Sequence, residues 1–203
     1  MQPDPTTRPE YSAAFQEIVS RIAESLGGLP DATLPVKMYI AGGAAMHFYT
    51  GIRFSIDIDA AFSHRILLPD NLDVSYRDAD GNALLLYLDR QYNEAFALIH
   101  EDAHEDSVPL ELDGVDPGIL DVRLLSPLDL AVSKISRLSD KDRADITSLA
   151  TRGLISAEAL GRRAQETASA YVGNQDVLKT SIMLACRLVE DVEAIRAGAV
   201  SPR

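Results

Sequence analysis

Two glycines and two aspartates are the residues of this chain whose types and spacing best suit chemistry. Gly42 and Gly43 end an apolar segment, and Asp57 and Asp59 follow with one residue between them. Side chains of a strand alternate between its faces, so the two carboxylates would point the same way. Paired carboxylates on a rigid element suit Mg²⁺, which prefers hard oxygen ligands and often shares them with phosphates. Glycines lack a Cβ, so phosphates could approach their backbone closely, next to a helix N-terminus that favours anions.

The elements that must position these residues can be predicted from the same segment. Residues 36–40 are apolar except for Lys37 and predict a strand, residues 44–50 predict a short helix, and residues 54–60 predict a second strand. Ile56 and Ile58 alternate with the aspartates, so we expect both isoleucines to point into a core. A glycine pair or an Asp-x-Asp pattern is common by itself. The two together, in this order of strand, helix and strand, are much more specific.

This order of elements and motifs resembles the DNA polymerase beta-like nucleotidyltransferase superfamily, whose active site has a Gly-Gly or Gly-Ser pair followed by alternating acidic residues. Further along the chain, Lys134 precedes a basic segment that contains Asp142 and Asp145. With these residues the chain is similar to the AbiE-type nucleotidyltransferase toxins and to related uncharacterised bacterial nucleotidyltransferases. The similarity covers most of residues 36–150.

The resemblance implies transfer of a nucleoside monophosphate from a nucleoside triphosphate, with Mg²⁺ as cofactor and release of pyrophosphate. Asp57 and Asp59 would bind the metal, and Gly42 and Gly43 would bind the nucleotide. Lys134 would contact the triphosphate and offset its charge, as a compact point charge can. Asp142 or Asp145 would orient it or help to activate the acceptor. Arg53, just before the second strand, could contact phosphate or simply cap a turn.

A third metal-binding carboxylate is often found on a neighbouring strand in this superfamily. Asp121 lies between Leu120 and Val122 and has the expected apolar-acid-apolar pattern. The alternatives are that Asp121 is a solvent-facing strand residue, or that Glu111 or Asp113 takes this position.

The resemblance also suggests partners. The acceptor would be a transfer RNA end or a protein hydroxyl, and the chain could be a toxin that pairs with an antitoxin protein. An RNA acceptor would need a basic surface, and the candidates are Arg137, Lys141, Arg143, Arg152, Arg162 and Arg163. Many superfamily members have serine or threonine close to the glycines, whereas this chain has Ala44. A catalytically silent, nucleotide-binding module is therefore the alternative function.

A competing pattern, His100-Glu101-x-x-His104, matches the His-Glu-x-x-His motif of zinc proteases. On a helix the two histidines would share a face and bind Zn²⁺, with Glu101 as the base. Pro109 follows closely, and no later helix obviously supplies a third ligand. A zinc metalloprotease is thus the less favoured interpretation of this pattern. The simpler interpretation is that these residues form a polar helix end.

Composition narrows the class of protein further. The chain has 203 residues, 46% of them apolar, and a net charge of −12, which argues against broad nucleic-acid binding. Residues 57–121 carry a balance of −13, so the remainder is nearly neutral. A single cysteine, Cys186, excludes an internal disulfide framework and fits a reducing cytoplasm. No segment approaches the roughly 20 apolar residues of a membrane span, so no membrane partner is expected.

The expected organisation is a disordered tail (residues 1–10), a small mixed-sheet α/β (α+β) nucleotidyltransferase core (11–125) and a C-terminal helical bundle (126–203). In the core we expect a helix over 11–26, a hairpin of 74–76 with 84–88, a helix over 92–104 and a strand over 119–125. Ser126 and Pro127 then predict a helix start. The helices of the last part are expected at 127–138, 140–151, 156–172 and 176–196.

Overall fold

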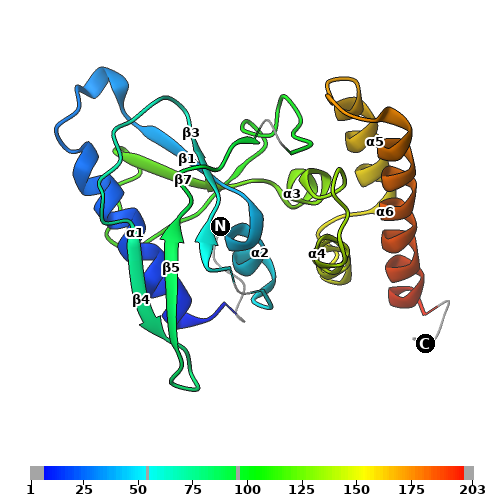
Figure 1. Ribbon diagram of the computed structural model, residues 1–203, viewed down its shortest axis with the longest axis horizontal. Coiled ribbons are helices and arrows are strands. Elements are labelled where there is room, and N and C mark those ends of the chain that lie inside the picture. Colours follow the sequence, from blue (N-terminus) through cyan, green and yellow to red (C-terminus); the bar gives the residue numbers. More distant parts are fainter. Residues whose placement is uncertain (1–6, 54, 95–96, 199–203) are drawn as a thin grey trace. The chain divides into compact units, whose positions relative to one another are not determined.

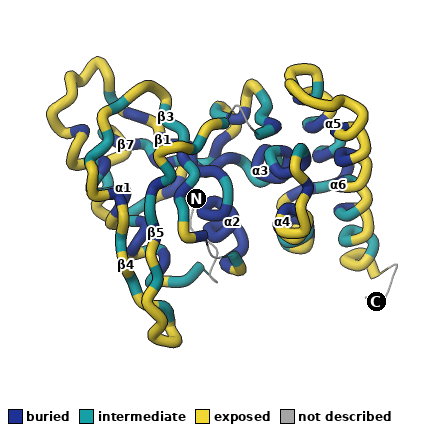
Figure 2. The backbone as a smooth tube through the Cα atoms, in the orientation of Figure 1, coloured by how far each residue is buried: buried dark blue, intermediate teal, exposed yellow. Residues whose placement is uncertain are grey.

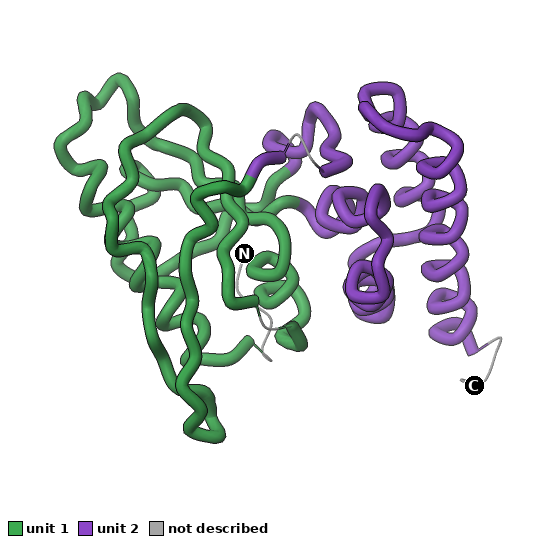
Figure 3. The backbone as a smooth tube through the Cα atoms, in the orientation of Figure 1, with its two compact units in different colours: residues 1–92, 107–125 green, residues 93–106, 126–203 purple. Residues whose placement is uncertain are grey.

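The computed structural model describes residues 7–53, 55–94 and 97–198, and it divides into two compact units (Figure 3). One unit, the α/β unit, contains residues 1–92 and 107–125. The other, the helical unit, contains residues 93–106 and 126–203. Residues 1–6 of the expected tail lie outside the described residues, and the first helix already begins at Pro9.

The α/β unit contains two mixed sheets, with strand orders β3-β1-β7-β6 and β2-β5-β4 (Figure 1). In the first sheet β1 and β7 run parallel, and β3 and β6 are antiparallel to their neighbours. In the second, β2 is parallel and β4 antiparallel to the central β5. The strands are β1 (Val36–Ile40), β2 (Asp57–Ile58), β3 (Ala60–Phe62), β4 (Asp73–Arg77), β5 (Ala83–Leu88), β6 (Val108–Pro109) and β7 (Leu120–Leu124).

Helix α1 (Pro9–Leu26) covers β4 and β5 with an apolar stripe. Proline at its start has no amide hydrogen to leave unpaired, and Gly27 follows its last residue. The stripe is at most 1% exposed and consists of Tyr11, Phe15, Ile18, Val19, Ile22 and Leu26. Phe15 meets Phe48 of α2 (Gly42–Thr50) edge to face at 4.8 Å between ring centroids. The predicted helix over 11–26 is confirmed.

Helix α2 is buried over almost its whole length, as Figure 2 shows. Its sequence is apolar all round, which is the pattern of a helix enclosed in a core. It ends at Gly51, whose left-handed φ of 65° closes the last turn. Because α2 is enclosed, the residues at its start are held rigidly.

The β4-β5 hairpin is confirmed, with the turn chemistry that its sequence predicts. Asp78 accepts hydrogen bonds from the backbone N–H groups of Asp80 and Asn82, and Gly81 adopts a φ of 83°. A short 3₁₀ helix, η1 (Asp31–Thr33), lies in the connection between α1 and β1.

The helical unit consists of α3 (Pro127–Ser133), α4 (Asp140–Thr151), α5 (Ala157–Ala168) and α6 (Gln175–Arg196). The long helix α6 packs against α4 and α5, and α3 packs against both of them as well. Side-chain caps mark the helix starts: Ser126, Ser139, Ser156 and Asn174 each accept a bond from a backbone N–H of the first turn. The mixed α/β part followed by helices confirms the expected fold class.

Three local expectations were wrong. Residues 101–106 form turns where a helix over 92–104 was predicted, and residues 95–96 lie outside the description. Helix α3 ends at Ser133, short of the predicted residue 138; residues 134–137 form turns, and Leu138 has a left-handed φ of 42°. The single strand predicted over 54–60 is instead β2 and β3, which belong to different sheets, and residue 54 lies outside the described residues. Because β2 begins only at Asp57, Ile56 is 61% exposed, whereas Ile58 is fully buried as expected.

Within the part of the chain that the structure describes, no helix has the length and apolar character that crossing a membrane requires.

Candidate functional site

Gly42 lies where β1 passes into α2. The space that a side chain at this position would need is occupied by Asp59. Gly42 adopts a left-handed φ of 55°, which residues other than glycine rarely tolerate. A Cβ added there would come within 2.8 Å of Cγ of Asp59. The backbone N–H of Ala41 also donates to the carbonyl of Asp59 at 2.9 Å. The first glycine is therefore required so that the Asp59 carboxylate can lie on the backbone at the start of α2.

Gly43 likewise leaves space for side chains of the residues just before Asp57. A Cβ on Gly43 would come within 2.6 Å of the Ser55 Cβ and 3.2 Å of the Arg53 Nε. The Ser55 hydroxyl donates to Oδ1 of Asp57. The side chains of residues 53, 55 and 59 thus pack directly against the backbone of the glycine pair.

His47 fixes the same segment from within α2. It is fully buried, and its Nδ1 donates to the carbonyl of Arg53 at 2.6 Å while its Nε2 accepts from the backbone N–H of Arg8 at 3.2 Å. Burial lowers the pKa of His47, and the bond to the Arg53 carbonyl opposes that shift. Its bonds require a neutral ring, so His47 is a structural residue that anchors Arg53.

Asp57 and Asp59 are both half-buried and flank the buried Ile58. Both carboxylates lie at the N-terminal end of α2, one against Gly42 and the other bonded to the serine that rests on Gly43. Among the described residues no group of three or more His, Cys, Asp or Glu could hold a metal ion. Two carboxylates nevertheless fit Mg²⁺, which usually completes its octahedron with water and substrate phosphates.

A prediction follows for Gly42→Ala. We expect it to displace Asp59 and to lower activity about as strongly as loss of that carboxylate, and to destabilise the fold by about 1–3 kcal/mol. The matched control is Gly114→Ala, because Gly114 also has a positive φ of 75° but no atom within 4 Å of an added Cβ. Thermal unfolding and nucleotidyl-transfer assays separate the two effects. Equal activity of the two variants would contradict the contact argument.

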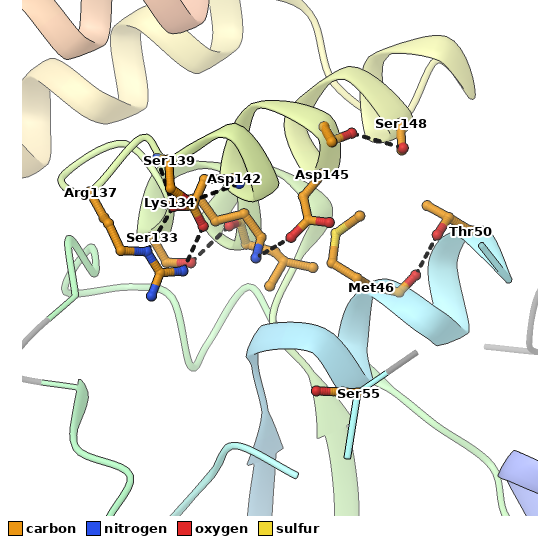
Figure 4. Close-up of polar contacts among 12 residues, drawn as sticks. Met46, Thr50, Ser55, Ser133, Lys134, Arg137, Ser139, Asp142, Asp145 and Ser148 are labelled. Carbon is orange, nitrogen blue, oxygen red and sulfur yellow. Dashed lines mark hydrogen bonds and ion pairs between the residues drawn. The ribbon is translucent and has the colours of Figure 1, made fainter. Parts of the chain in front are cut away.

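In the helical unit, Lys134 and Asp145 form a buried ion pair (Figure 4). Nζ of Lys134 lies 2.8 Å from Oδ2 of Asp145, and the side chains are only 5% and 7% exposed. Lys134 caps the C-terminal end of α3, and Asp145 comes from the second turn of α4. The turn at Leu138 returns the chain so that α4 presents this carboxylate to the lysine.

Asp142 lies one turn before Asp145 and is occupied by bonds that stabilise the helix start. It forms a capping box with Ser139, and Arg137 donates two hydrogen bonds of 2.7 Å to its carboxylate. Burial opposes ionisation, but the hydrogen bonds from Arg137 and Ser139 outweigh it and lower the pKa of Asp142 to about 2. Of the two candidate aspartates, it is therefore Asp145 that contacts Lys134.

The sequence profile of the family described as "Nucleotidyltransferase of unknown function (DUF6036)" matches residues 17–194. The chain belongs to this nucleotidyltransferase family. No curated protein and no solved structure gives a significant match to it. The matched range contains both glycines, both strand aspartates and the Lys134–Asp145 pair.

For a nucleotidyltransferase, Asp121 lies at the wrong end of the sheet to join the two aspartates. In the parallel register of β1 and β7, Asp121 is opposite Lys37, whereas Asp59 is beside Ala41. Four residues of extended strand separate these positions, or about 13 Å. Asp121 is also ion-paired with Arg123 at 3.1 Å. The alternatives Glu111 and Asp113 are exposed, and the Asp113 carbonyl accepts a bond from Gln16.

Asp89 is a carboxylate near Asp59 that the sequence patterns did not single out. Ile58 pairs with Leu88 in the parallel β2-β5 register, and the backbone N–H of Asp89 donates to the carbonyl of Ile58 at 3.0 Å. Asp89 therefore follows β5 as Asp59 follows β2, and neighbouring strands lie about 4.8 Å apart. It is half-buried, and its Oδ1 accepts a bond from the backbone of Gln91. The available signal was an acidic residue directly after the apolar run of residues 83–88.

We expect Asp89→Asn to weaken divalent-cation affinity and transfer activity by about 10- to 100-fold, as loss of an outer metal partner does. Asp121→Asn is the matched control and should leave both unchanged. Isothermal titration with Mn²⁺ and a transfer assay measure the two quantities. The opposite ranking of the two variants would restore Asp121 as the third carboxylate.

The zinc-protease pattern does not assemble a metal site. Because residues 101–106 are turns, the two histidines do not share a helical face. His104 Nε2 lies 3.0 Å from Oε1 of Glu94, and His100 Nε2 lies 3.8 Å from Oε2 of Glu166. Zinc enzymes need three protein ligands, and no such group is found within residues 7–53, 55–94 and 97–198. The His104 contact lies within the 93–106 segment, and only His100 approaches another element, α5, at Glu166.

Proposed function

We propose that this nucleotidyltransferase uses Mg²⁺ at Asp57 and Asp59 to transfer a nucleoside monophosphate from a nucleoside triphosphate, such as ATP, to a hydroxyl group. The observation that carries the proposal is the contact between the glycine pair and the acidic strand. Gly42 and Gly43 have no room for a Cβ because Asp59 and Ser55 occupy it. Residue types that only make a turn would not need to fit each other in this way.

In the α/β unit, different residues are proposed to bind the phosphates and the cation. The backbone at the start of α2 offers N–H groups to phosphate, and the orientation of that enclosed helix favours an anion there. Ser55 fixes one carboxylate oxygen of Asp57, so its other oxygen is directed to the cation. Bound Mg²⁺ would neutralise phosphate charge and activate the attacking hydroxyl. Arg53, held against Gly43, is proposed to contact phosphate.

Lys134 and Asp145 are assigned their roles by the order of motifs in the chain. We propose that Lys134 offsets the charge of the triphosphate and that Asp145 holds its ammonium group in place. Buried lysine is a suitable choice because its compact charge is little screened there. Asp142 is proposed to act indirectly, by fixing the start of α4 that carries Asp145.

The acceptor is proposed to be a transfer RNA end or a protein hydroxyl in the cytoplasm, with the chain acting as the toxin of a toxin-antitoxin pair. Of the basic residues that could face RNA, Arg137 and Arg163 are engaged in ion pairs with Asp142 and Asp129. Lys141, Arg143 and Arg162 are exposed and are the residues to test for RNA contact.

The test is incubation with each α-³²P-labelled nucleoside triphosphate, Mg²⁺, total bacterial RNA and cell lysate. We expect label on RNA or on protein with the wild type and none with the Asp57→Ala/Asp59→Ala variant. The labelled class names the acceptor, and the effective triphosphate names the base. Triphosphate binding without transfer would favour the silent nucleotide-binding module, and absence of binding would overturn the proposal.

A further inference from the structure

Tyr11 presents a buried hydroxyl without a hydrogen-bond partner, inside the α/β unit. The residue is 0% exposed, and within the described part of the chain its phenolic oxygen makes no hydrogen bond. A buried hydroxyl that loses its water and gains no partner costs free energy, so such groups are rare in native proteins. Phenylalanine would pack equally well without this cost. Packing alone therefore does not explain why this residue is a tyrosine.

The ring of Tyr11 is held in place by aromatic neighbours from two elements. Its centroid lies 4.2 Å from that of His47 and 6.3 Å from that of Phe48, both on α2. It also meets Tyr76 of β4 edge to face, at 6.4 Å between ring centroids. These contacts fix the ring, and with it the direction of the hydroxyl.

The neighbours of Tyr11 belong to the candidate site. His47 is the residue that anchors Arg53, and Arg53 lies on Gly43 beside the serine that binds Asp57. Burial raises the pKa of Tyr11 far above its usual range, and the charges of Tyr76, Asp57 and Asp59 raise it further, against the opposing charge of Arg53. The phenol therefore keeps its proton, and both carboxylates act on it. A protonated phenol is a hydrogen-bond donor, and a carboxylate is a suitable acceptor for it.

We propose that Tyr11 is a positioning residue of the metal site, whose hydroxyl donates to a carboxylate of the Asp57–Asp59 pair when that pair binds a divalent cation. The inference rests on the proposed function and deepens it. A carboxylate that ligates a metal is commonly held by a hydrogen bond from an outer residue, which sets the direction of its oxygens. Tyr11 supplies this donor from α1. Its hydroxyl gains a carboxylate acceptor when the cation is bound.

The proposal requires an unusual combination of effects for Tyr11→Phe. The apo protein should be as stable as the wild type or more stable, because the variant removes a buried hydroxyl without a partner. The affinity for divalent cations should fall by about 10-fold, the lower end for loss of an outer metal partner. A purely structural tyrosine would not raise or preserve stability while weakening cation binding.

Tyr49→Phe is the matched control. Tyr49 is also a buried tyrosine of the α/β unit, but its hydroxyl donates to the carbonyl of Leu125 at 2.9 Å. Its loss should lower the melting temperature and leave cation affinity unchanged. The two tyrosines are thus expected to show opposite patterns.

The experiment measures free Mn²⁺ by electron paramagnetic resonance during titration of the full chain with Mn²⁺ alone, together with thermal unfolding of the apo protein. Wild type, Tyr11→Phe, Tyr49→Phe and Asp57→Asn are compared. Weaker Mn²⁺ binding by Tyr11→Phe without loss of stability supports the proposal. Binding equal to wild type, or weaker binding together with a lower melting temperature, overturns it. If the wild type has no Mn²⁺ site that Asp57→Asn removes, the proposed function itself fails.

Discussion

Replacing either Asp57 or Asp59 with asparagine should lower nucleotidyl transfer by about 10³-fold or more while the fold is retained. Asparagine keeps the size of each side chain, so residue 59 can still lie on Gly42 and residue 57 can still accept from Ser55. What is lost is one negative charge of the metal site. Losing a single preorganised electrostatic contact in an active site commonly costs about 10²–10³ in rate, and loss of a metal-binding charge should cost at least as much.

The measurement is label transfer from the triphosphate that the wild type uses, at several Mg²⁺ concentrations. Asp73→Asn is the control, because Asp73 is an exposed carboxylate on β4 of the same unit. It should retain wild-type activity. High Mg²⁺ should rescue the two site variants little. Wild-type activity in Asp57→Asn and Asp59→Asn would exclude these residues as the metal site.

Local signals in the sequence predicted the elements that position the site. The apolar spacing and the glycine stop of 11–26, and the serine cap and proline at 126–127, act within a few residues of the helix ends. The predicted bounds 140–151 agree with α4, and 36–40 agrees with β1. Such features could be found because each is complete within one short segment.

Strand pairing was not predictable in the same way, and it decides which carboxylates meet. Asp121 has the favourable apolar-acid-apolar pattern, but its register places it opposite Lys37, away from the glycines. Asp89 has a plainer pattern and yet follows the strand that pairs with β2. Register is a property of two strands distant in sequence, and alternation within one strand does not specify its partner.

The glycine pair shows what the structure adds even where the sequence prediction holds. From sequence, the glycines were explained by close approach of phosphate. In the structure, the groups that lie against them are side chains of the chain itself, from Asp59 and Ser55. The two motifs are therefore one physical unit, and a substitution in either displaces the other.

The Lys134–Asp145 pair carries the second large expected effect, on stability. Asp145→Asn should destabilise the helical unit by about 3–5 kcal/mol, because it leaves a buried ammonium group without its counter-charge. The pair is only 5% and 7% exposed, so water does not replace the lost carboxylate. Urea unfolding followed by far-ultraviolet circular dichroism measures the change.

The double variant Lys134→Met/Asp145→Leu separates stability from function. Removing both charges in favour of apolar groups of similar volume should recover most of the stability, since replacement of a buried ion pair is often neutral or better. Transfer activity should not return, because the proposed phosphate contact needs the Lys134 charge. Lys179→Met is the control, because it removes an exposed ion pair with Asp176 in the same unit and leaves the buried pair intact. A stable double variant with wild-type activity would show that the buried pair serves only the helical unit, and the site would then consist of the glycines and aspartates alone.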